Sequence, residues 1–94
     1  MATVYILYSK SIAKFYVGSC KNLKVRILKH QNKEFNKSFT LRAHDWELYF
    51  SIDNLGYNQA REIEKHIKKM KSKAYIRNLK KYADMKSKLI LKYA

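Results

Sequence analysis

The first twenty residues restrict the fold more than any other part of the chain. Two short runs rich in β-branched and aromatic residues, Thr3–Tyr8 and Phe15–Gly18, are separated only by the polar stretch Ser9–Lys14. Runs of this length and composition predict β-strands, and so short a connection predicts an antiparallel hairpin. Side chains alternate between the two faces of a strand, so one tyrosine in each run, Tyr5 or Tyr16, lies opposite its apolar neighbours.

The middle of the chain predicts a helix, a loop and a third strand. Asn22 is a favourable N-cap for a helix that runs to about His30, with Leu23, Ile27 and Leu28 as its buried stripe. The polar, basic stretch 31–44 has no periodicity and is interpreted as a loop. Residues 46–52 form the third predicted strand, which Asn54-Leu55-Gly56 ends.

The last third of the chain predicts helices. Apolar residues at spacings of three and four (Ala60, Ile63, Ile67, Met70) form an amphipathic stripe, and Ser72 can cap a further helix. Whether 72–94 is one helix or two stays open. The predicted fold is therefore α+β: a three-stranded antiparallel sheet flanked by helices, in the order β-β-α-β-α-α. We expect a single domain, 1–94, in which 80–94 is a helical C-terminal extension.

Charge indicates the kind of partner. The 94 residues hold 21 Lys and Arg against 7 Asp and Glu, a net charge of +14, which favours a polyanion such as nucleic acid. Apolar residues make up 47% of the chain, enough for a globular domain with one modest core. No apolar run approaches the ~18 residues that span a bilayer, and the start of the chain does not resemble a signal peptide. A lone Cys20 and three histidines argue against disulfides and a cysteine-rich zinc site, so we expect a reducing, cytoplasmic setting.

Several short motifs occur together in a fixed order. Thr3-Val4-Tyr5 is followed eleven residues after its tyrosine by Tyr16-Val17-Gly18; Arg26 comes ten residues past Tyr16, and His30 four further. A later helix contains Glu64-Lys65-His66-Ile67-Lys68. In this order and spacing the motifs resemble those of the GIY-YIG nuclease family, over about 3–79. The chain is also similar to the nuclease domain of bacterial excision-repair incision proteins. It departs from the family pattern at Thr3 and Val4, and at Ser19, where several members have a lysine.

The resemblance implies a divalent-metal-dependent endonuclease that hydrolyses DNA phosphodiester bonds, on duplex or branched DNA. It implies that Glu64 holds Mg²⁺ or Mn²⁺ and that Arg26 binds the scissile phosphate. It assigns Tyr5 or Tyr16 as the base that acts on the attacking water, and the other tyrosine as the group that orients the water or the phosphate. His30 would hydrogen-bond a tyrosine or the phosphate. Mg²⁺ is often bound by only one or two carboxylates, so a single Glu64 suffices.

Lysines among aromatic residues are typical of nucleic-acid binders. The lysines and arginine expected to contact DNA phosphates are Lys33, Lys37, Arg42, Lys68, Lys69, Lys71 and Lys73. Two other functions stay open: a basic nucleic-acid-binding module whose catalytic activity is weak or lost, and an RNA-associated structural protein. Glu64 also has an ordinary interpretation, a helix-surface ion pair with Lys68 four residues later.

The nuclease hypothesis makes a geometric prediction. Tyr5 and Tyr16 should project from one face of the sheet, and Arg26 and Glu64 should converge on that face. The four side chains should be exposed in a shallow groove rimmed by lysines.

Overall fold

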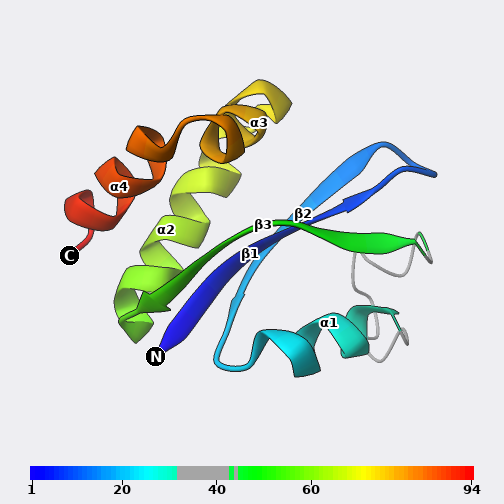
Figure 1. Ribbon diagram of the computed structural model, residues 1–94, viewed down its shortest axis with the longest axis horizontal. Coiled ribbons are helices and arrows are strands. Elements are labelled where there is room, and N and C mark those ends of the chain that lie inside the picture. The colour runs from blue at the N-terminus through cyan, green and yellow to red at the C-terminus, as the bar shows by residue number, and fades with distance from the viewer. Residues whose placement is uncertain (32–42, 44) are drawn as a thin grey trace.

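The computed structural model describes residues 1–31, 43 and 45–94 of the chain. Its single sheet has the antiparallel order β2-β1-β3, as Figure 1 shows. The strands are β1 (Ala2–Ser9), β2 (Lys14–Cys20) and β3 (Trp46–Leu55). The helices are α1 (Leu23–Gln31), α2 (Tyr57–Met70), α3 (Lys73–Lys81) and α4 (Ala83–Lys92). The predicted α+β class, element order and hairpin are therefore confirmed.

Polar side chains cap two of the helices as the sequence predicts. The Asn22 side-chain oxygen accepts a hydrogen bond from the Val25 N–H at 3.2 Å, and the Ser72 hydroxyl accepts one from the Tyr75 N–H at 3.1 Å. The stretch 72–94, which the sequence left open, forms two helices because the backbone turns to an extended conformation at Tyr82. In the described part of the chain, no helix is long and apolar enough to cross a membrane.

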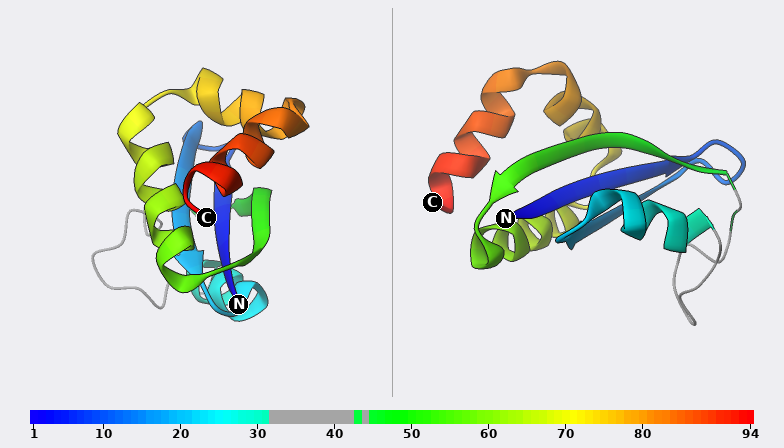
Figure 2. Two further views of the ribbon diagram at one scale, coloured as in Figure 1. Left: turned by 90° about the vertical axis from the view of Figure 1, so that its left-hand side faces the viewer. Right: turned by 60° about the horizontal axis from the view of Figure 1, so that its bottom comes forward.

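Helices cover both faces of the sheet. Helices α2, α3 and α4 lie on one face and α1 lies on the other (Figures 1 and 2). Two clusters of buried side chains result, so the expectation of one core was wrong. The larger cluster includes Val4, Ile6, Ile52, Ile63, Ile67 and Leu79. The smaller cluster contains Tyr5, Leu7, Cys20, Ala43 and Trp46, against which Leu23 and Ile27 of α1 pack.

Two residues of the predicted buried stripes are exposed. Leu28 is 56% exposed, because it follows Ile27 by one position and so points about 100° away from the face of α1 that packs on the sheet. Met70 is 46% exposed, because it is the last residue of α2 and Lys71 leaves the helix in a left-handed conformation with φ 48°.

The third strand begins at Trp46, as the sequence predicts, but continues past the predicted end at Ile52. It extends to Leu55, which is 1% exposed, and Asn54 accommodates this with a left-handed φ of 60°. At its other end, Asp45 accepts hydrogen bonds from the hydroxyls of Ser9 and Ser11 and from the Ser11 N–H. These bonds lower the pKa of Asp45 to about 2 and fasten the β1–β2 turn to the start of β3.

Candidate active site

The two predicted tyrosines lie side by side on the sheet face that α1 covers. Their ring centroids are 6.3 Å apart with the planes tilted by 35°, and Tyr16 also meets the edge of the Trp46 ring at 6.5 Å. Tyr5 is only 1% exposed, whereas Tyr16 is partly exposed. The structure therefore brings the two phenols together, with Tyr5 buried and Tyr16 partly exposed.

Gly18 allows Tyr5 to occupy this position. The two residues are cross-strand partners in the β1–β2 hairpin. A Cβ atom at residue 18 would lie 2.5 Å from the Tyr5 hydroxyl oxygen and 2.6 Å from its Cζ atom, closer than non-bonded atoms approach. The Tyr5 ring thus fills the space that any side chain at Gly18 would need. Its hydroxyl group consequently reaches the edge strand β2, next to Ser19.

Glu64 meets the same edge strand from the other face of the sheet. The Ser19 hydroxyl donates a hydrogen bond of 2.5 Å to Oε1 of Glu64, and the Lys68 ammonium donates one of 2.6 Å to Oε2. The Glu64 side chain is 21% exposed. Both carboxylate oxygens are therefore held in place, one by a strand residue and the other by the cation one helical turn later. The predicted Glu64–Lys68 pair is confirmed.

The predicted convergence on one face was wrong in its details. Helices α1 and α2 lie on opposite faces of the sheet (Figure 2), and Tyr5 is buried rather than exposed. The reason is the strand order β2-β1-β3, which makes β2 an edge strand that side chains from both faces can approach. The carboxylate approaches from the α2 side and the phenols from the α1 side.

Burial and the neighbouring charged groups change the pKa of Tyr5. Burial raises the pKa of the Tyr5 phenol well above its ordinary value, and the neighbouring Tyr16 raises it further. Glu64 also acts on the Tyr5 pKa in the upward direction, and the Arg26 guanidinium acts in the downward direction. The downward effect of Arg26 does not offset the upward effect of burial. Tyr5 stays a neutral phenol at ordinary pH.

A pocket of ≈ 570 Å³ opens beside these residues. Ser19 and Arg26 both line it. The arginine therefore shares a cavity with Ser19, the residue whose hydroxyl bonds Glu64. Three further polar or cationic residues that sequence reasoning missed, Lys21, Tyr57 and Arg61, also line it. A signal for Arg61 was present, because it precedes Glu64 by three positions and so shares its side of α2.

Some predicted residues do not join this site, and others lie outside the described residues. Lys68 contacts Glu64, and it lines a second pocket together with Lys71 and Lys73. Lys69 lies apart, on a pocket that includes His66. Lys33, Lys37 and Arg42 fall outside the described part of the chain, as does the side chain of His30, although its backbone belongs to α1.

Glu64 is the residue in this arrangement that suits a divalent ion. No group of three or more His, Cys, Asp or Glu side chains able to hold a metal lies within the described residues. A hard ion such as Mg²⁺ keeps most of its water and accepts one protein carboxylate with phosphate oxygens. The Glu64 carboxylate at the rim of the edge strand fits that kind of site, and Ser19 fixes its orientation.

Comparison with known proteins identifies the family of the chain. Neither a curated protein nor a solved structure matched the chain. The family model described as "GIY-YIG catalytic domain" matches residues 1–83, slightly more than the 3–79 of the sequence resemblance. The matched range includes both tyrosines, Arg26 and Glu64. The chain therefore belongs to the GIY-YIG family, whose members are endonucleases.

Proposed function

We propose that this protein is a divalent-metal-dependent endonuclease that hydrolyses DNA phosphodiester bonds at the β2 edge. The observation that carries the proposal is the position of Glu64, which Ser19 holds beside the strand that covers Tyr5. A carboxylate, two phenols and a guanidinium near one strand edge are the group types that phosphodiester hydrolysis needs.

Arg26 and its neighbours would bind the DNA backbone. A guanidinium has a planar fork of donors that matches two phosphate oxygens, and it stabilises the charge that builds up in the transition state. Lys21 and Arg61, which line the same pocket, would contact flanking phosphates. Such contacts orient DNA without reading its sequence.

The two tyrosines would have different roles. Because burial keeps Tyr5 protonated, we assign it a hydrogen bond donated to a phosphate oxygen, which requires the 1%-exposed side chain to become accessible when DNA binds. Tyr16 is more exposed, and we assign it to the attacking water. Its oxygen accepts the water's proton while its own proton passes to a phosphate oxygen or to solvent. This exchange avoids a free phenolate, because the phenol gains one proton as it gives up another.

Glu64 would hold the metal ion together with phosphate oxygens and water. When bound, the ion would supply positive charge at the phosphate and at the leaving oxygen. Ser19 keeps Oε1 oriented, and Lys68 occupies Oε2 in the free protein. Lys68 would therefore move from the carboxylate to the DNA as the site is loaded.

The test is cleavage of a panel of labelled DNAs: duplex, single strand, flap and four-way junction, each with Mg²⁺, Mn²⁺ or EDTA. We expect products only with the metals, and a loss of at least about a hundredfold in Glu64→Gln, as for the removal of a group that stabilises charge in a transition state. Glu62→Gln, an exposed substitution two residues away on α2, is the matched control. Cleavage in EDTA, or full activity in Glu64→Gln, would exclude this mechanism.

A second candidate function is a nucleic-acid-binding module without catalysis. Two observations favour it: Lys68 already neutralises Glu64, and Tyr5 is buried. The same panel separates the two functions, because a binding module retards the DNAs in EDTA and yields no product with any metal.

A further inference from the structure

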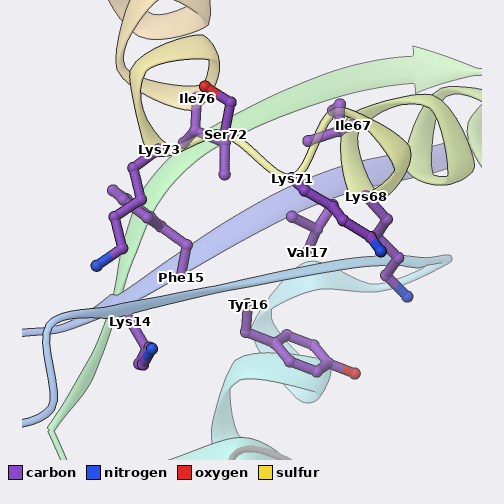
Figure 3. Close-up of a pocket in the computed structure, with 10 residues that line it drawn as sticks. All are labelled: Lys14, Phe15, Tyr16, Val17, Ile67, Lys68, Lys71, Ser72, Lys73 and Ile76. Carbon is purple, nitrogen blue, oxygen red and sulfur yellow. The ribbon is translucent and has the colours of Figure 1, made fainter.

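A second pocket lies on the α2–α3 side of the edge strand. It has a volume of ≈ 440 Å³, within the range of about 300–1,000 Å³ usual for small-ligand sites. Figure 3 shows it between β2, the end of α2 and the start of α3. Its floor is apolar, formed by Phe15, Val17, Ile67 and Ile76.

Lysines surround this floor. Four of them line the pocket: Lys14, Lys68, Lys71 and Lys73. None of the described residues that line the pocket is acidic. Lys73 also donates a hydrogen bond of 2.8 Å to the Ala13 carbonyl, which ties the start of α3 to the β1–β2 turn. The rim is thus positively charged, and the charge of Lys68 is partly compensated by its ion pair with Glu64.

Lys68 connects this pocket to the candidate active site. Its ammonium bonds the Glu64 carboxylate and its chain lines the pocket. Tyr16 marks the boundary from the other direction: it also lines the pocket, but Figure 3 shows its ring on the opposite side of β2, directed toward α1. A DNA strand that is bound at Glu64 and runs along β2 toward α3 would pass over the pocket.

We propose that this pocket binds the base of one unpaired DNA nucleotide adjacent to the phosphate that is cut. The inference rests on the proposed function and adds its substrate class. A base offers a flat apolar surface to the floor, and its flanking phosphates complement the lysines. An uncharged apolar ligand would leave the cations unused, and inorganic phosphate would leave the floor uncovered. A base within a duplex is stacked and paired, so the nucleotide that enters must be extrahelical or single-stranded.

The test compares two duplexes that differ in one group. One carries a single extrahelical 2-aminopurine nucleotide, and the other carries an abasic tetrahydrofuran residue at the same place. Binding is measured by anisotropy in EDTA, so that no cleavage intervenes. We expect the wild-type protein to prefer the duplex with the base by about fivefold to a hundredfold, the range for one base on an aromatic platform. The fluorescence of the 2-aminopurine should change on binding.

Two variants test whether the preference for the duplex with the base depends on this pocket. Phe15→Leu removes the aromatic part of the floor and should reduce the preference toward equality without weakening binding to the abasic duplex. Lys14→Met with Lys71→Asn removes two rim charges, and asparagine tolerates the left-handed backbone at residue 71. Lys65→Met with Lys88→Met removes the same charge outside the pocket and is the matched control. We expect the rim variant to weaken binding to the extrahelical base more than the control does.

Several outcomes would overturn the proposal. One is equal affinity of the wild-type protein for the two duplexes; another is a preference that survives in Phe15→Leu and in the rim variant. Self-association that the rim variant abolishes, with no base preference, would make a second copy of the chain the occupant. Cleavage of DNA without base preference would retain the nuclease and reject the pocket's role. Base preference without cleavage would support the pocket on a binding module.

Discussion

The hydroxyl group of Tyr5 lies against the backbone of Gly18, where a Cβ atom would come within 2.5 Å of it. This relationship explains a glycine in the middle of a strand, where glycine is otherwise unfavourable. Gly18 does not have a positive φ, so its role is close approach rather than backbone freedom.

Gly18→Ala should therefore displace the Tyr5 ring. Tyr5 is buried, so the ring cannot move without disturbing the smaller cluster of buried side chains, on which α1 packs. We therefore expect a loss of about 1–3 kcal/mol in the free energy of unfolding. Urea denaturation measures the loss. Gly56→Ser is the control, because a Cβ atom there would meet nothing closer than 3.8 Å and serine is a good N-cap for α2. A Gly18→Ala protein as stable as the wild type would refute this explanation.

Alkaline pH should destabilise the protein through Tyr5. Its pKa is raised in the folded protein above the ordinary value of 10.0, so the unfolded chain loses the phenolic proton first as pH rises. The stabilisation is complete below pH 10 and is lost as pH rises through the folded-state pKa. Tyr5→Phe should flatten the decline in thermal stability above pH 10. Part of the decline will remain, because burial also raises the pKa of Tyr75. A decline identical to that of the wild type would contradict the assignment.

Ser19 should act on Glu64 as a positioning residue. In Ser19→Ala the carboxylate loses the hydrogen bond to Oε1, and we expect weaker binding of Mn²⁺. The binding is measured by electron paramagnetic resonance of the DNA-free protein. Ser19→Thr keeps the hydroxyl and suits a strand, so it should restore binding. The free energy of unfolding should change by no more than about 1.5 kcal/mol in either variant. If both variants bind Mn²⁺ equally well, Ser19 does not position the carboxylate.

Lys68 should have the opposite effect on the metal. Its ammonium occupies Oε2 at 2.6 Å, so it competes with a cation for the same oxygen. Lys68→Met should therefore bind Mn²⁺ more tightly than the wild type at low salt. Lys65→Met, whose lysine pairs only loosely with Glu62 at 3.8 Å, should leave the affinity unchanged. Tighter binding in both variants would indicate a general effect of net charge instead.

Much of this fold follows from local sequence patterns. The hairpin, the caps at Asn22 and Ser72 and the alternation that separates Tyr5 from Val4 are properties of neighbouring residues, and each was predicted. The covering of both faces of the sheet was not predicted, because it depends on how Trp46 and Leu7 meet α1 across long sequence distances. The same limit applies to helix ends: Met70 continues the apolar spacing of α2, yet the turn at Lys71 removes it from the core.

The candidate site was predicted in its members but not in its arrangement. The motifs identified Tyr5, Tyr16, Arg26 and Glu64, and all four lie near the edge strand. The sequence does not specify the face of the sheet from which each side chain approaches β2, because that depends on the strand order β2-β1-β3. The burial of Tyr5, the hydrogen bond from Ser19 and the pocket lined by Arg61 are consequences of that strand order and of the packing of α2 against it.

Salt should reveal whether the lysines bind phosphate. Each phosphate that the protein neutralises on duplex DNA makes the slope of log affinity against log salt more negative by about 0.9, because counterions are released. Wild-type binding, measured by anisotropy in EDTA from about 50 to 200 mM salt, should therefore weaken steeply.

Lys71→Asn removes a cation beside the path of the DNA and should make the slope shallower by about 0.9, equally for all sequences. Lys65→Met loses the same charge where no DNA is expected and should keep the wild-type slope. A wild-type affinity that is flat over this range would remove nucleic acid as the partner, and equal slopes in the two variants would place the DNA away from the end of α2.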